Sequence, residues 1–265
     1  MNTILYTTDN TLDPAIMALC QRILLREAGE LPIVSVSQKP LELGRNVCVG
    51  EIGRSWYSLY TQLLAGLAAI DTDWVVMAEH DCLYTAEHLH YQPKNPDVFH
   101  YNSNCWLVQW GGNHPELDGM YSYWPHRVAL SQLICRRSLL EQATRDVVCL
   151  LDMGLRVEQG LRWHGEPGVV SETFRKAYLE ATSGRPIQLQ DRLQQYVQGY
   201  ASGHFATEQP NLDIRHASNF SGPRRGKKRC YELAPWGRFA DLMEVTSGNY
   251  HYECRYQSPS VLTSG

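Results

Sequence analysis

The sequence lacks several features that would place it in other classes of protein. None of its eight cysteines forms a CxxC pair, which argues against a zinc ribbon or a thioredoxin-type site. We expect reduced thiols, several of them small buried core residues. No apolar run approaches the roughly 18 residues of a membrane-spanning helix. The N-terminus has neither the basic start nor the apolar run of a signal peptide, so we expect a cytoplasmic protein.

A strong charge bias is also missing. The net charge of −4 gives no overall attraction to nucleic acid or to anionic membranes, so any such affinity must come from a local patch. We find no internal repeat, low-complexity tract or linker in the 265 residues. The sequence therefore predicts one domain over residues 1–265, and the last stretch, about 248–265, shows no clear period and could form an extension.

The first 37 residues predict a β-α-β unit. Residues 3–8 are β-prone, and Asp13 followed by Pro14 is a typical helix start. Apolar residues then recur at helical spacing until Gly29, and residues 32–37 form a second strand. Such units imply a parallel sheet.

The rest of the chain gives a coarser prediction. We expect a loop over 38–53, a strong helix from Trp56 with Arg54 and Ser55 at its start, and a buried strand over 74–78. Further predicted elements are strands at 98–101, 106–109 and 211–215, helices at 85–90, 138–153 and 171–181, and a long loop over 110–127 that is rich in Gly, His, Tyr and Trp.

The clearest chemical signal is the acidic triplet that follows strand 74–78. Ligands of open α/β sheets bind beyond the carboxyl ends of the strands. If the backbone stays extended, Glu79 and Asp81 point to one spot and His80 faces away. Converging carboxylates repel each other unless a cation or proton intervenes, and a hard divalent cation is the simplest solution. The alternative is an acidic turn without a ligand.

Two tracts resemble a set of family 2-like glycosyltransferases of the GT-A type found in bacteria and phages. Residues 77–84 (MAEHDCLY) resemble the acidic metal motif in a Glu-His-Asp-x-Leu-Tyr form. Residues 212–222 (LDIRHASNFSG) resemble an Asp-Ile-Arg-His-x-x-Asn-Phe-[Ser/Thr]-Gly block near the end of the same set. The resemblance covers about residues 3–238. It implies a Rossmann-like GT-A α/β fold whose mainly parallel central sheet is flanked by helices.

The resemblance also implies a metal centre. Glu79, Asp81 and His216 would hold Mn²⁺ or Mg²⁺. The cation would neutralise the leaving diphosphate of a nucleoside-diphosphate sugar, which by analogy with the fold is a UDP-sugar. Glu79 stands where Asp is commoner, which leaves open whether it or only Asp81 touches the metal. A surface His that ends a strand is the alternative for His216.

Donor binding is predicted at the end of the first strand. In a GT-A fold this end holds the base and ribose of the donor, and here it consists of Thr7, Thr8 and Asp9. We predict that His80 also contacts the donor. Arg54, at a helix start, is suited to face phosphate. Turn-forming residues and a solvated Arg are the alternatives.

A basic run and a Glu-Pro-Gly turn complete the candidate site. Residues 222–229 carry five cations in eight residues. Arg224 and Arg225 could close over the donor as a lid; a solvated loop and a contact with DNA are the alternatives. An inverting transferase needs a base. Glu166 is our first candidate, with Glu172 and Asp213 behind it, and a retaining mechanism would need none.

The sequence leaves several classes of acceptor open. The phage members of the resembling set suggest a hydroxymethylated base in DNA, with the protein then in the host cytoplasm. A bacterial glycan and a small molecule are the alternatives. A metal-dependent hydrolase would use the same carboxylates, whereas a non-catalytic binding module would not need them with His216. Aromatic residues that suit base stacking, sugar packing or the core are Trp106, Trp110, Tyr121, Tyr123 and Trp124.

Overall fold

A computed structural model describes most of the chain. The described residues are 1–112, 114–123, 125, 128–152, 166–169, 184, 200–219 and 228–246. The predicted helix over 171–181, the predicted extension over 248–265, and the candidate residues Trp124, Glu172, Arg224 and Arg225 lie outside these ranges.

The predicted β-α-β opening is confirmed. It consists of β1 (Asn2–Thr8), α1 (Pro14–Ala28) and β2 (Ile33–Ser37). The Asp13 side chain accepts hydrogen bonds from the backbone N–H groups of Ala15 and Ile16, which satisfies two donors that the first turn leaves unpaired. Gly29 then leaves the helix with a φ of 55°, a conformation that glycine adopts at no steric cost.

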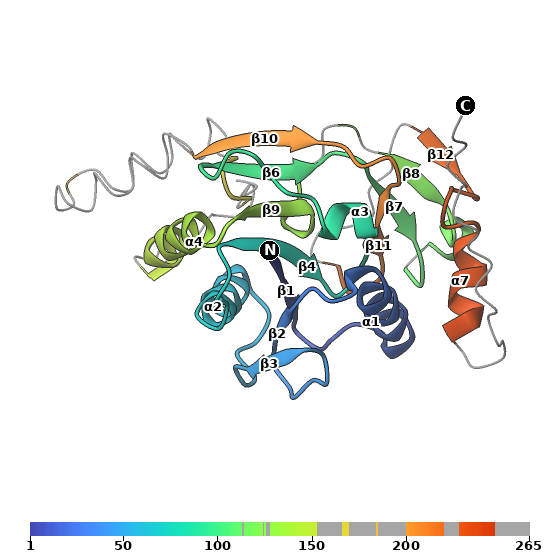
Figure 1. Ribbon diagram of the computed structural model, residues 1–265. Coiled ribbons are helices and arrows are strands. Elements are labelled where there is room, and N and C mark those ends of the chain that lie inside the picture. The colour runs from blue at the N-terminus through green and yellow to red at the C-terminus, as the bar shows by residue number, and fades with distance from the viewer. Residues whose placement is uncertain are drawn as a thin grey trace, which may run out of the picture.

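A seven-stranded sheet forms the centre of the protein (Figure 1). Its order is β10-β6-β9-β4-β1-β2-β3, and every neighbouring pair is parallel except the two that involve β9. The prediction of an α/β fold with a mainly parallel central sheet is therefore confirmed. The other strands are β3 (Arg45–Cys48), β4 (Trp74–Glu79), β6 (Val98–Asn102), β9 (Leu133–Arg136) and β10 (Ala201–Phe205).

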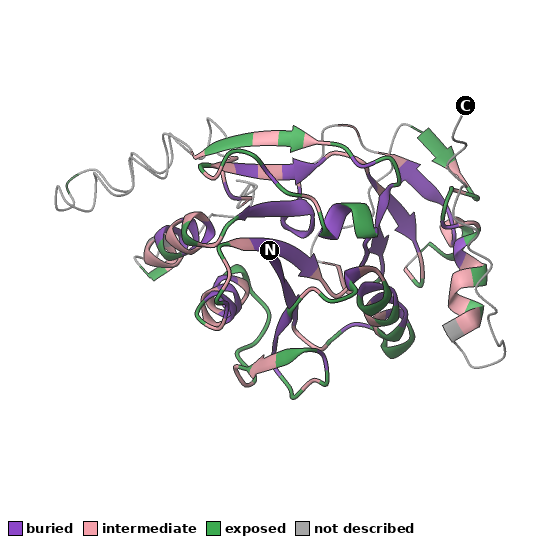
Figure 2. Ribbon diagram, in the orientation of Figure 1, coloured by how far each residue is buried: buried purple, intermediate pink, exposed green. Residues whose placement is uncertain are grey.

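Helices cover both faces of this sheet (Figure 1). On one face α2 (Trp56–Leu67) and α4 (Arg137–Asp152) pack over side chains such as Leu5 and Met77. On the other face α1 and α3 (Ala86–Leu89) cover side chains such as Ile4 and Val76. The alternation of Ile4 with Leu5 and of Val76 with Met77 between the faces follows the two-residue period of a strand. Figure 2 shows the result, since the central strands are buried almost throughout.

Helix α2 approaches β1 and β2 closely because it contains Gly66. A Cβ atom at this position would lie 2.4 Å from Leu5 Cδ1 and 2.6 Å from Val36 Cγ2, distances that packed carbon atoms do not adopt. This contact fixes how α2 lies on the sheet. It therefore also fixes the position of the first turn of α2, which follows Arg54 and Ser55.

A second sheet lies beside the first. Its order is β12-β8-β7-β11-β5. Its core includes Tyr121, and α7 (Phe239–Thr246) packs on it through Phe239. The bounds are β5 (Cys82–Leu83), β7 (Cys105–Gln109), β8 (Tyr121–Tyr123), β11 (Asn211–Arg215) and β12 (Lys228–Cys230).

Two predicted loops were wrong in part. The stretch 110–127 contains the short helix Pro115–Leu117 and strand β8, and the stretch 38–53 contains β3. Strands of three or four residues are too short to show a hydrophobic period, so nothing local distinguishes them from loops. A further short helix, Leu130–Gln132, leads into β9. None of the described helices combines the length and apolar character that crossing a membrane requires.

Candidate functional site

The candidate site lies where the strand order of the main sheet reverses. The chain forms β1, β2 and β3 toward one edge, then returns to form β4 on the other side of β1. Ligands of open α/β sheets bind in the crevice that such a switch point leaves beyond the carboxyl ends of the strands. Thr7 pairs with Glu79 in register, so Thr8, the last residue of β1, and Asp9, which follows it, lie beside His80 and Asp81.

The register of the second sheet brings Asp81 and His216 together. Strand β5, which directly follows Asp81, pairs antiparallel with β11, with Asp213 opposite Cys82. The backbone N–H of Ile214 donates to the Asp81 carbonyl at 2.8 Å. His216 follows the end of β11, and its Nε2 lies 3.4 Å from Asp81 Oδ2. Residues far apart in the sequence thus meet through one strand pairing.

The orientation predicted for His80 is wrong. Strand β4 ends at Glu79, and the chain turns at His80 and Asp81, so the alternation of an extended strand does not apply. Candidate ligand atoms of His80, Asp81 and His216 lie within 4.8 Å of one another. Glu79, Asp81 and Cys82 form a second such group. Asp81 belongs to both groups and is their centre.

The surroundings of Asp81 keep its carboxylate ionised. Burial alone would raise its pKa, but the approach of His216, the charge of His80 when that ring is protonated, and the charge of Arg215 hold the pKa of Asp81 well below its usual range. Asn219 Nδ2 also donates to Asp81 Oδ2 at 2.9 Å, while Asn219 Oδ1 accepts from the His216 backbone N–H at 2.6 Å. Sequence reasoning missed Asn219, although it stands within the tract 212–222.

The tautomer of His216 follows from its neighbours. The backbone N–H of Ser218 donates to His216 Nδ1 at 3.2 Å, so a neutral ring carries its proton on Nε2, toward Asp81. A metal ion bound at Nε2 would replace that proton, since a ligating imidazole offers a lone pair. The two side chains thus face each other, with Nε2 3.4 Å from Oδ2, at the place predicted for a cation.

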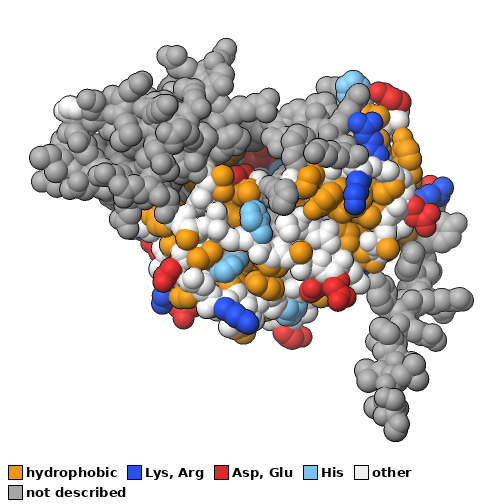
Figure 3. Space-filling view, turned by 90° about the horizontal axis from the view of Figure 1, so that it is seen from above, with side chains coloured by type: hydrophobic (Ala, Val, Ile, Leu, Met, Phe, Trp, Pro, Cys, Tyr) orange, Lys and Arg blue, Asp and Glu red, His pale blue; other side chains and the backbone are white. Residues whose placement is uncertain are grey.

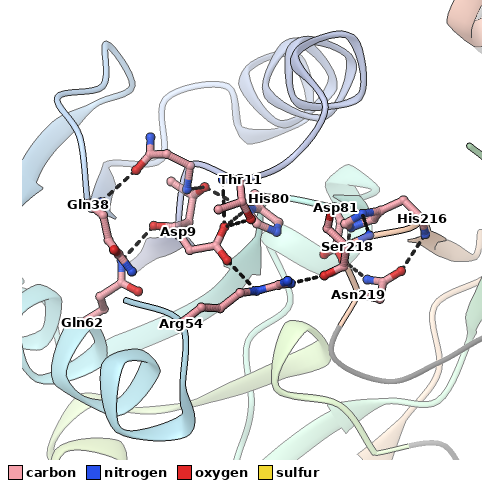
Figure 4. A network of polar contacts seen from close by, with 12 residues as sticks. Asp9, Thr11, Gln38, Arg54, Gln62, His80, Asp81, His216, Ser218 and Asn219 are labelled. Atoms are coloured by element: carbon pink, nitrogen blue, oxygen red, sulfur yellow. Dashed lines mark hydrogen bonds and ion pairs between the residues drawn. The ribbon is translucent and has the colours of Figure 1, made fainter. Parts of the chain in front are cut away.

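Asp9 and Arg54 form the other half of the site (Figure 4). Arg54 Nε lies 2.8 Å from Asp9 Oδ2, and its Nη2 donates to the Ser218 carbonyl. Burial would raise the pKa of Asp9, but hydrogen bonds from Thr11, the charge of His80 when that ring is protonated, and the charge of Arg54 lower it. Arg54 thereby links the end of β1 to the loop that carries His216.

His80 connects the two halves. Its Nδ1 forms a 2.8 Å hydrogen bond with Thr8 Oγ1 and lies 3.8 Å from Asp9 Oδ1. Burial lowers the pKa of His80, against the pull of Asp81 and Asp9, which favours a neutral ring. Thr7 is buried within β1, and Gln62 Nε2 donates to the Thr8 carbonyl at 2.8 Å. Sequence reasoning missed Gln62, whose place on a helix gives no sign of this contact.

The candidates for a catalytic base are placed differently. The Glu166–Val169 turn is held on β6, where Tyr101 Oη donates to the Pro167 carbonyl at 2.5 Å. In the sheet, β9 lies between β6 and β4. Asp213 is buried, and its Oδ1 lies 3.0 Å from Arg215 Nε, so this carboxylate is already engaged in an ion pair. Glu166 thus stays the preferred prediction.

Of the basic run, the structure describes Lys228 and Arg229. Both are exposed on β12, which pairs with β8 at an outer position of the second sheet. On the described part of the face in Figure 3, Lys and Arg side chains are scattered, and some of them lie beside Asp or Glu. No continuous basic surface is visible there.

Comparison with known proteins gives distant likenesses of structure. Neither models of protein families nor curated proteins give a match. A glycosyltransferase involved in the glycosylation of the major capsid of PBCV-1 is similar over 93% of this chain and 98% of its own, with 10% identity and a TM-score of 0.41. The bifunctional IspDF from Campylobacter jejuni is similar over 78% of this chain and 50% of its own, with 9% identity and a TM-score of 0.38. The glycosyltransferase GlyE of Streptococcus pneumoniae TIGR4 is similar over 76% of this chain and 44% of its own, with 9% identity and a TM-score of 0.37. Likenesses this distant assign no activity to the chain.

Proposed function

We propose that this chain is a metal-dependent glycosyltransferase that moves a sugar from a nucleoside-diphosphate sugar to an acceptor hydroxyl. UDP-sugars are the first candidates for the donor. The observation that carries the proposal is the convergence of Asp81 with His216 and Glu79 at the switch point of the sheet, beside the Asp9–Arg54 pair. A nucleotide and a cation are the ligands that suit such a crevice.

The donor set fits a hard divalent cation. Asp81 is ionised, and it forms one group with Glu79 and another with His216, so a carboxylate and an imidazole each lie next to it. Donors of these two kinds suit Mn²⁺ better than Mg²⁺. Burial raises the pKa of the Cys82 thiol well above its usual value, so without a metal this group is a neutral thiol. When bound, the cation would neutralise the charge that develops on the leaving diphosphate.

The chain's own residues would hold the rest of the donor. Thr8 and Asp9 end β1 where the nucleoside is expected. Arg54 lies beside the start of α2, where the unpaired backbone N–H groups and the helix dipole favour an anion. A phosphate in this place would compete with the Asp9 carboxylate for the Arg54 guanidinium, since both prefer the same planar donor fork.

The hydrolase alternative is less well supported. A metal-dependent hydrolase should show further His and Asp ligands close by. In the part of the chain that the structure describes, the groups of three metal-ligating side chains are the two that share Asp81. The acceptor prediction of a hydroxymethylated DNA base rests on the resemblance to phage enzymes and on residues 224–229, of which the structure describes two, so it stays a prediction.

Binding of nucleotides tests the proposal. We would measure the melting temperature with UDP, GDP, ADP and CDP, each with Mn²⁺ and with EDTA. One nucleoside diphosphate should stabilise the wild type in Mn²⁺ alone, because a ligand of the native state raises its stability by mass action. Asp81→Asn should lose this shift. Stabilisation that is equal in EDTA, or absent with all four nucleotides, would contradict the proposal.

A further inference from the structure

Exposed apolar side chains gather at the start of α2. Among the described residues, the large hydrophobic side chains that are exposed are Met1, Leu25, Ile52, Trp56, Tyr57 and Tyr231. Three of them fall between positions 52 and 57, with exposed fractions of 38% for Ile52, 41% for Trp56 and 46% for Tyr57. Single exposed apolar residues are ordinary, but a local group of them is typical of a binding surface.

This group borders the proposed site. Gln62, in the second turn of α2, donates to the carbonyl of Thr8 at the end of β1. The first turn of α2 therefore lies farther out, beyond the carboxyl edge of the sheet. Arg54, two residues before Trp56, contacts Asp9 and the Ser218 carbonyl. A molecule that rests on Trp56 and Tyr57 would thus lie next to the place expected for the donor.

The Trp56 ring packs against a neighbouring ring, while a large part of both Trp56 and Tyr57 stays accessible. The Trp56 ring packs near the buried Tyr60, with ring centroids 6.4 Å apart and planes tilted by 31°. The Asp152 carboxylate, in the last residue of α4, lies near Tyr57 and raises the pKa of its hydroxyl. Rings that are already positioned lose little freedom when a ligand stacks on them, which favours binding.

The charges around the rings favour an uncharged partner. Lys39 pairs with Glu51 at 3.5 Å, and Arg54 pairs with Asp9 at 2.8 Å. Asp152 adds a third carboxylate next to Tyr57. These two cations and three carboxylates give no excess of positive charge, whereas a polyanion such as DNA needs one. Carboxylates do accept hydrogen bonds from hydroxyl groups, which carbohydrates carry in abundance.

We infer that Trp56 and Tyr57 bind the acceptor of the proposed reaction, and that this acceptor is a neutral glycan whose sugar rings stack on the two aromatic rings. The inference rests on the proposed function in calling the glycan an acceptor. The surface itself rests on the exposure of both rings, the packing of Trp56 against Tyr60 and the local charge balance.

Binding of neutral oligosaccharides tests the inference. The probes are maltohexaose, cellohexaose and mannohexaose, with a short single-stranded oligonucleotide as the polyanion, and binding is followed by saturation-transfer NMR and tryptophan fluorescence. The variants are Trp56→Ala, the milder Trp56→Leu, and Tyr57→Ala. Tyr231→Ala is the matched control, because Tyr231 is 55% exposed and follows β12 in the second sheet. Melting temperatures establish that each variant is folded.

At least one hexasaccharide should bind the wild type and the Tyr231→Ala variant equally, and the Trp56 variants at least tenfold more weakly. The UDP and Mn²⁺ stabilisation should be the same in all of them. Wild type that binds UDP with Mn²⁺ but none of the hexasaccharides would overturn the inference and leave the proposed function standing. Equal glycan binding by the Trp56 variants, or Trp56-dependent binding of the oligonucleotide alone, would also overturn it. Trp56-dependent glycan binding without any nucleotide binding would support the surface and remove the proposed function.

Discussion

Replacing Asn219 by Ala should weaken metal binding without removing any candidate ligand. The Asn219 amide donates to Asp81 Oδ2 at 2.9 Å and accepts from the His216 backbone N–H at 2.6 Å. One side chain thus fixes both residues on which the proposed metal centre depends. Sequence reasoning gave Asn219 no role, so the variant tests the geometry that the structure adds.

The size of the effect follows from the kind of contact. A hydrogen bond to an ionised carboxylate contributes about 1.5–3 kcal/mol. Because roughly 1.4 kcal/mol is a factor of ten in an equilibrium constant, losing this bond should weaken the affinity for Mn²⁺ by about 10–100-fold, in the range usual for groups that orient metal ligands. Loss of the bond to the His216 N–H adds to the same effect.

Electron paramagnetic resonance of free Mn²⁺ measures the affinity directly. The titration compares wild type, Asn219→Ala, Asp81→Asn and a matched control, Asn104→Ala. The Asn104 amide also makes two hydrogen bonds, but to the carbonyls of Thr207 and Glu208 rather than to the candidate ligands. The control should bind Mn²⁺ as the wild type does. If Asn219→Ala does so too while Asp81→Asn does not bind, the role derived for Asn219 is refuted.

Three further predictions concern catalysis and stability. Asp81→Ala should abolish transfer in a folded protein, and excess EDTA should do the same to the wild type; near-normal turnover in either assay would rule out the metal assignment. Glu166→Gln should lower kcat sharply with little change in donor affinity, as for loss of a base, and an unchanged kcat would point to another base or to retention. Burial lowers the pKa of His88 to about 3 in the folded protein, whereas a histidine of the unfolded chain has a pKa of about 6.5. The unfolded chain therefore takes up the proton first as the pH falls. The contribution of His88 to the free energy of unfolding should therefore drop by about 2 kcal/mol between pH 7 and 5. In denaturant unfolding, the free energy of unfolding of His88→Leu should fall less over this pH range than that of the wild type.

Local signals predicted the N-terminal half of the fold well. Asp13, Pro14 and Gly29 mark a helix by the chemistry of its ends, and strand β4 appears as an uninterrupted apolar run. Such signals depend on neighbouring residues alone, and a β-α-β unit has one common way to pack. The end of β4 could therefore be predicted as a site before any distance was known.

Contacts set by pairing of distant strands could not be predicted in this way. The β5–β11 register places His216 beside Asp81, and β5 is only two residues long. The turn after Glu79 depends on the same pairing, which is why His80 was expected on the wrong side. Asn219 and Gln62 act through contacts across the fold, and no local pattern distinguishes such residues from other polar ones.

The most direct test of the proposed function is release of the nucleotide from a sugar donor. Purified protein would be incubated with UDP-glucose, UDP-galactose, UDP-N-acetylglucosamine and the corresponding GDP- and ADP-sugars, together with the neutral hexasaccharides, and the products identified by mass spectrometry. We predict a nucleoside diphosphate and a hexasaccharide heavier by one sugar, formed in Mn²⁺, absent in EDTA, and absent with Asp81→Asn. Nucleotide release that continues in EDTA, or that Asp81→Asn carries out as fast as the wild type, would contradict a metal-dependent transferase centred on Asp81.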